Sequence, residues 1–83
     1  MGLFKSRAEK ELDAAMLRID MNVSNNYKDA AQMDLVEFEE LLISFEQSGK
    51  IKGKSLLYYE KRLGFYKEKL KGYTHKDQKP YWT

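Results

Sequence analysis

The chain has 83 residues and a mass of 9.8 kDa, which is enough for one small domain with a single hydrophobic core. Hydrophobic residues make up 42% and charged residues 34%, the net charge is +2, and there is no cysteine. These values exclude a disulfide scaffold, a zinc site of the cysteine type and thiol chemistry. We therefore expect one helical domain over residues 1–83.

The first predicted helix spans residues 7–24. Its apolar residues recur every three or four positions, as on one face of a helix: Ala8, Leu12, Ala15, Ile19 and Val23. Ser6 and Glu9 have the spacing of a capping box, which places the beginning of the helix. The segment from Met1 to Ser6 also fits the loose pattern for N-myristoylation of Gly2, and this leaves a lipid-anchored membrane-surface protein as one alternative function.

The second predicted helix spans residues 27–48 and ends at Gly49, which suits a left-handed C-cap. Its apolar face is expected to carry Tyr27, Ala31, Leu35, Phe38, Leu42 and Phe45. Three residues that prefer turns, Ser24, Asn25 and Asn26, separate it from the first helix. Because the apolar spacing continues through them, one continuous helix from Arg7 to Ser48 is an alternative.

A basic loop over residues 49–54 leads to the third predicted helix, residues 55–72, with Ser55 as its cap. The apolar spacing of this helix follows a heptad pattern, suited to packing on a neighbouring helix: Leu56, Tyr59, Leu63, Tyr66, Leu70 and Tyr73. In the tail, residues 73–83, we expect Tyr81 and Trp82 to pack back onto the helices. The predicted fold is all-α, a small antiparallel three-helix bundle. The alternative is a dimerising helical hairpin with one long first helix.

Charge is unevenly distributed along the chain. Residues 1–48 hold 5 Lys and Arg against 10 Asp and Glu, whereas residues 49–83 hold 10 against 3. The simpler interpretation is that the acidic second helix pairs with the basic third helix across an antiparallel seam. The other interpretation is an anion or nucleic-acid contact made by the basic side chains: Lys50, Lys52, Lys54, Arg62 and Lys69.

No catalytic constellation is legible in the chain. Residues 49–55 read G-x-x-x-G-K-S, one residue short of the phosphate-binding loop, and a helix precedes them where that loop follows a strand. His75 is the single histidine, which rules out a nitrogen-rich metal site and a Ser-His-Asp triad. We expect no enzyme activity, no metal and no cofactor.

A second apolar stripe lies opposite the core faces of the second and third helices. Helices with two apolar faces ordinarily have neighbours on both sides, so we expect a protein interface formed by Met33, Val36, Ile43, Tyr58 and Phe65. The sequence thus predicts a cytoplasmic, non-enzymatic interaction module that binds a second copy of itself or another helical protein. A nucleic-acid-binding accessory protein is a less favoured alternative, and a membrane partner is not expected.

Overall fold

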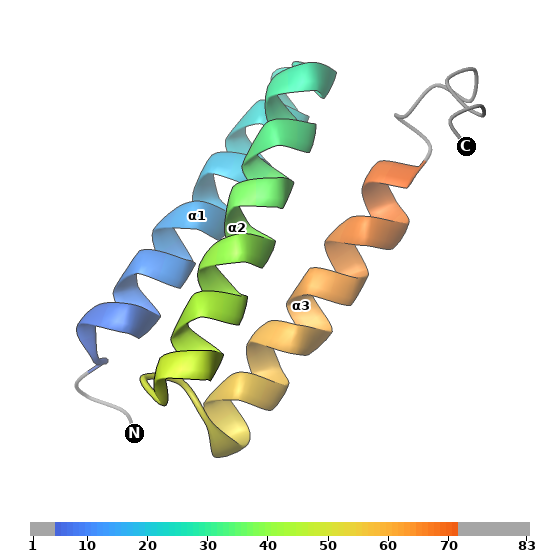
Figure 1. The fold of residues 1–83 in the computed structure, drawn as a ribbon. Coiled ribbons are helices and arrows are strands. Elements are labelled where there is room, and N and C mark those ends of the chain that lie inside the picture. The colour runs from blue at the N-terminus through green and yellow to red at the C-terminus, as the bar shows by residue number, and fades with distance from the viewer. Residues whose placement is uncertain (1–4, 72–83) are drawn as a thin grey trace.

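The computed structural model describes residues 5–71, and these form three helices that run up, down and up (Figure 1). Helix α1 spans Arg7–Ser24, α2 spans Lys28–Ser48 and α3 spans Gly53–Lys71. The prediction of an all-α antiparallel three-helix bundle is confirmed. The expectations for Gly2 and for the tail, with Tyr73, His75, Tyr81 and Trp82, lie outside the described residues.

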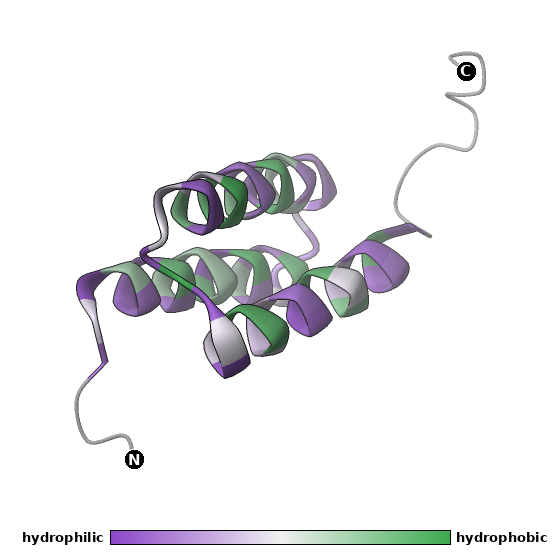
Figure 2. Ribbon diagram, turned by 60° about the horizontal axis from the view of Figure 1, so that its bottom comes forward, coloured by the Kyte–Doolittle hydropathy of each residue, from purple (hydrophilic) through white to green (hydrophobic). Residues whose placement is uncertain are grey.

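The core lies between the three helices and comes from the predicted apolar faces. Green and purple alternate along every helix when the ribbon is coloured by hydropathy, as a period near 3.6 residues requires (Figure 2). The best-buried large side chains are Leu12, Ile19, Phe38, Ile51, Tyr66 and Leu70. Helix α2 packs on both α1 and α3, so it is the central helix of the bundle.

The ends of α1 and α2 follow from their cap residues. The Ser6 hydroxyl accepts a hydrogen bond from the Glu9 backbone N–H at 3.1 Å, and the Ser6 N–H donates to the Glu9 carboxylate at 2.9 Å. This is the predicted capping box. Gly49 has a φ of 78°, a left-handed conformation that glycine adopts without steric cost, and it ends α2 as predicted.

A turn separates α1 from α2, so the alternative of one continuous helix is wrong. Asn26 has a φ of 62°, in the left-handed region that asparagine tolerates better than most residues. Tyr27 then stands at the N-cap of α2, outside the helix, and its side chain is exposed. The prediction that Tyr27 belongs to the core is therefore incorrect, because the turn carries it away from α1 and α3.

Helix α3 begins two residues earlier than predicted, at Gly53. Ser55 is consequently not its cap but lies inside the first turn, where its hydroxyl donates to Glu9 of α1. In the loop before α3, Ile51 is almost completely buried. The burial of Ile51 in the core thus places the loop two residues before α3 begins at Gly53.

Candidate functional site

Helix α3 contacts α1 through a ladder of hydroxyl–carboxylate hydrogen bonds. Ser55 donates to Glu9 at 2.7 Å, Tyr59 to Asp13 at 2.8 Å and Tyr66 to Asp20 at 2.8 Å, and each pair is separated by 46 residues. A constant separation is what two parallel helices in register produce, because both rise by the same amount per residue. The ladder therefore fixes the register of α3 on α1.

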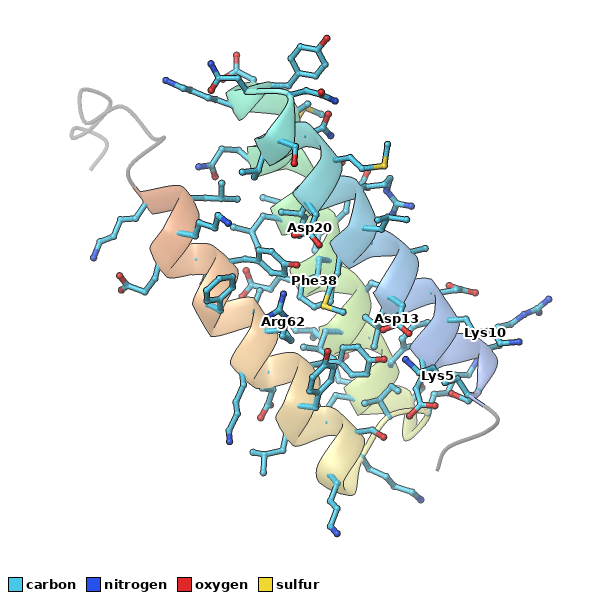
Figure 3. The ribbon with its side chains drawn as sticks, turned by 180° about the vertical axis from the view of Figure 1, so that it is seen from behind. Lys5, Lys10, Asp13, Asp20, Phe38 and Arg62 are labelled. Carbon is cyan, nitrogen blue, oxygen red and sulfur yellow. The ribbon has the colours of Figure 1, made fainter. Side chains whose placement is uncertain are left out.

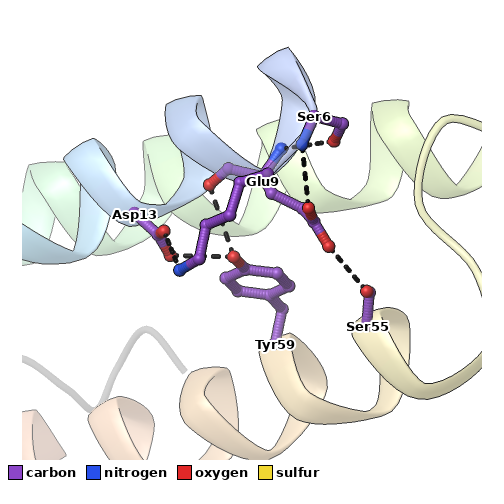
Figure 4. Close-up of polar contacts among 6 residues, drawn as sticks. Ser6, Glu9, Asp13, Ser55 and Tyr59 are labelled. Carbon is purple, nitrogen blue, oxygen red and sulfur yellow. Dashed lines mark hydrogen bonds and ion pairs between the residues drawn. The ribbon is translucent and has the colours of Figure 1, made fainter. Parts of the chain in front are cut away.

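The lower end of the ladder surrounds the beginning of α1 (Figure 4). Tyr59 is buried, its hydroxyl donates to Asp13, and the Lys5 ammonium bonds the same carboxylate at 2.6 Å. Glu9 accepts from Ser55 and from the Ser6 N–H through its two oxygens. One carboxylate thus serves both as the cap of α1 and as a contact to α3.

The upper end of the ladder is a chain of three side chains between α1 and α3. Arg62 donates to the Tyr66 hydroxyl at 3.0 Å, and that hydroxyl donates to Asp20. The guanidinium also lies 4.9 Å and 5.0 Å from the ring centroids of Phe65 and Tyr66. Figure 3 shows the molecule from behind, with the side chains of Asp13, Asp20 and Arg62 in the space between α1 and α3. Phe38 of α2 lies in the same region.

The ladder changes the acidity of its members. Burial, and then the hydrogen bond to Asp13, raises the pKa of Tyr59 far above its ordinary value. Burial and the bond to Asp20 raise the pKa of Tyr66 in the same way, whereas the bonds from Ser55 and Ser6 lower the pKa of Glu9. The two tyrosine shifts favour the neutral form of each side chain, and the Glu9 shift favours its ionised form.

On the other side of α3, an exposed ion pair marks the seam with α2. The Lys67 Nζ atom lies 2.9 Å from Oε2 of Glu39, and both side chains are partly exposed to solvent. Val36 and Ile43 lie one turn from Glu39, Gly64 lies one turn from Lys67, and Leu57 lies two turns before Gly64, so all four share this side of their helices. We call the surface that they form the outer face.

The structure places the five predicted interface residues on two separate surfaces. All five are exposed, between 44% and 67%, but they do not share one side of the bundle. Met33 lies one turn before Val36, at the edge of the outer face. Phe65 comes two residues before Lys67, about 200° around the helix, and with Tyr58 it lies on the side of α3 that carries Arg62 toward α1.

The five predicted anion contacts are also divided. Lys50 and Lys52 are exposed in the loop, and Lys54 is exposed in the first turn of α3. Arg62 is half-buried in the ladder, and Lys69 lies 5.6 Å from the Phe65 ring centroid. The predicted row of Tyr58, Arg62, Phe65 and Lys69 therefore exists, but its two cations cover the ring of Phe65.

The described residues were also compared with the requirements of a metal site and of a membrane span. Residues 5–71 contain no cluster of three His, Cys, Asp or Glu side chains that could hold a metal. A hollow of about 430 Å³ lies at the end of α1 and is lined by Leu17, Asp20, Met21, Ser24 and Asn25. It is shallow and open to solvent. In the same part of the chain, no helix combines the length and apolar character needed to cross a bilayer.

The comparisons with protein-family models, with curated proteins and with solved structures gave no match for this chain. Sequence reasoning missed the ladder and the exposed side chains of Leu17, Met21 and Leu57. One signal for the ladder was present: Asp13 and Asp20 are seven residues apart, and so are Tyr59 and Tyr66.

Proposed function

We propose that this chain is a non-enzymatic helical module for protein–protein interaction and that it self-associates through its exposed apolar side chains. The observation that supports the proposal is the number of large apolar residues left half exposed. They occur on all three helices and in the turn between α1 and α2: Leu17, Met21, Tyr27, Met33, Val36, Ile43, Leu57, Tyr58 and Phe65. Where such residues gather on one surface, exposed apolar area is typical of interaction sites.

Some of these apolar residues lie on the side of α2 that faces away from α1, where the described helices do not cover them. Helix α1 covers the opposite side of α2, where Ala31 and Phe38 are buried, so it leaves Met33, Val36 and Ile43 uncovered. The proposal includes the cytoplasmic location expected from the sequence.

Nucleic-acid binding is the second candidate, because the basic loop and the row from Tyr58 to Lys69 combine cations with aromatic rings. In such sites bases stack on open ring faces. Here Arg62 lies over Phe65 and is also hydrogen-bonded to Tyr66, which favours the protein interface. Binding of single-stranded RNA or DNA at about 50 mM salt, lost steeply as salt rises, would support this candidate instead.

Sedimentation equilibrium of the full chain tests the proposal. The chain is expected to associate at micromolar concentration, and Val36→Asp or Phe65→Asp to yield a folded monomer when the substituted surface is the interface. Ala14→Asp, at an exposed position of α1 outside both surfaces, is the matched control and leaves association unchanged. A native chain that is monomeric at every concentration would contradict self-association.

A further inference from the structure

The outer face presents features that a second copy of this chain would satisfy. Val36 and Leu57 are each 53% exposed and Ile43 is 44% exposed, with Met33 beside them at 67%. The Lys67–Glu39 ion pair joins α2 to α3 at this face. Met33, Val36 and Ile43 lie on the α2 side of the pair, and Leu57 lies on the α3 side. The outer face is therefore a two-helix surface with an apolar centre, and no described part of the chain covers it.

Gly64 is the second feature of this face. It lies in the middle of α3, its φ is not positive, and a Cβ added there would meet no atom within 4 Å. Nothing within residues 5–71 requires glycine at this position, although glycine inside an exposed helix costs stability relative to alanine. A glycine in a helix allows the backbone of another helix to approach closely. Gly64 lies two turns from Leu57, on the same face.

The charges on α2 and α3 are complementary. Residues 28–48 hold one lysine against six acidic residues, and residues 53–71 hold six basic against two acidic residues. Glu40 of α2 and Lys61 of α3 are exposed and form no ion pair within residues 5–71. Both lie one turn from residues of the outer face, so they are available to a partner that offers the opposite charge.

Charge selects the symmetry of a dimer formed through this face. A two-fold axis in the interface and perpendicular to the helices would lay α2 on α2 and α3 on α3, with like charges opposed. A two-fold axis parallel to the helices lays α2 of each copy on α3 of the other. Only the second arrangement brings the acidic helix against the basic helix on both sides of the axis.

We propose that the outer face binds a second copy of this chain around a two-fold axis parallel to the helices, with α2 of each copy antiparallel to α3 of the other. This inference rests on the proposed function and assigns self-association to one of the two exposed surfaces. The surface with Tyr58 and Phe65 lies outside the dimer contact.

The register of this dimer follows from the contacts within one chain, because an axis parallel to the helices preserves height along them. Glu39 is level with Lys67, and Gln32 donates to the backbone carbonyl of Leu70 at 2.9 Å. Ile43 is therefore level with the turn of α3 that ends near Gly64. Glu40 of one copy comes within one turn of Lys61 of the second copy, and the contact occurs twice.

The face is large enough for a dimer of moderate affinity. Helix α3 has 19 residues and is therefore about 28 Å long. Two helices side by side, each about 10 Å wide with side chains, give a projected face of roughly 560 Å². A corrugated face exposes more accessible surface than its projection, and a standard interface buries about 800 Å² on each partner.

Charge reversal tests the arrangement, with sedimentation as the measurement. At about 50 mM salt, Glu40→Lys is expected to raise the dimer Kd about tenfold, because it opposes two pairs of like charges. The double variant Glu40→Lys with Lys61→Glu is expected to restore the Kd to within about threefold. Glu11→Lys carries the same charge change on α1 and is the control, with an unchanged Kd.

Gly64→Ala provides a second, independent readout. In the monomer it is expected to raise the thermal midpoint, because alanine stabilises an exposed helix relative to glycine, while it weakens the dimer severalfold by separating the two helices. An unchanged Kd in Gly64→Ala, or a double charge variant that fails to restore binding, would overturn the inference. A dimer that resists these changes but is lost in Phe65→Asp would overturn it and leave the proposed function standing. A chain that is always monomeric would overturn both.

Discussion

At the scale of single residues, the structure depends on three hydroxyls that reach across from α3 to α1. Tyr59 and Tyr66 are each at least 98% buried, and their hydroxyls end on carboxylates of α1. Hydrogen bonds to charged acceptors contribute more than neutral ones. These bonds also fix the register of α3, which apolar packing alone specifies less strictly.

Removal of the Tyr66 hydroxyl tests the ladder directly. Tyr66→Phe keeps the ring against Phe38 but deprives Arg62 and Asp20 of their common partner. We expect the free energy of unfolding to fall by about 1.5–3 kcal/mol, as for other hydrogen bonds to charged groups. Tyr58→Phe is the control, because its exposed hydroxyl has no partner within residues 5–71, and its effect should stay within about 0.5 kcal/mol. Equal effects in urea unfolding would contradict the ladder.

The ladder also predicts how stability depends on alkaline pH. The pKa values of Tyr59 and Tyr66 are raised in the folded chain, and that of unfolded tyrosine is about 10. A raised pKa stabilises the fold below the unfolded value, and this stability is lost as the pH rises above about 10. We expect the native chain to lose stability more steeply from pH 9 to 11 than the Tyr59→Phe, Tyr66→Phe double variant. Parallel profiles in urea unfolding would show that the tyrosines are not responsible.

At the scale of helices, periodicity and caps were sufficient to predict the three elements. The capping box at Ser6 and the left-handed Gly49 act locally, so the sequence contains all the information that they require. The start of α3 could not be predicted in the same way. It depends on Ile51, whose burial is a tertiary contact, and on Ser55, whose partner Glu9 lies 46 residues away.

The turn between α1 and α2 depends on the conformation of Asn26. Its φ of 62° disfavours residues with a Cβ, least so asparagine. We expect Asn26→Ala to lower the free energy of unfolding by about 1 kcal/mol, and Asn26→Gly to leave it unchanged or raise it. Asn25 has a φ of −89°, so Asn25→Ala is the matched control. Equal unfolding midpoints for Asn26→Ala and Asn26→Gly would contradict this account of the turn.

At the scale of the whole molecule, the sequence predicted the two apolar stripes but not their positions relative to each other. Helical spacing shows that Val36 and Phe65 lie opposite their core faces. It does not show which neighbour lies beside each of them. That depends on how α3 rotates on α2, and the ladder to α1 fixes this rotation. Only the structure therefore separates the outer face from the surface of Tyr58 and Phe65.

The proposed dimer is tested most directly by cross-linking between single cysteines, since the chain has none of its own. Gln47 of α2 and Leu57 of α3 are level and lie on the same side of the two helices, so the parallel two-fold axis places each opposite the other in the partner copy. Oxidation of an equimolar mixture of Gln47→Cys and Leu57→Cys chains is expected to give a disulfide dimer containing one of each. Each variant alone should remain largely uncross-linked. Cross-linking of either variant with itself as readily as in the mixture, or no cross-link under conditions where sedimentation shows dimers, would contradict the arrangement.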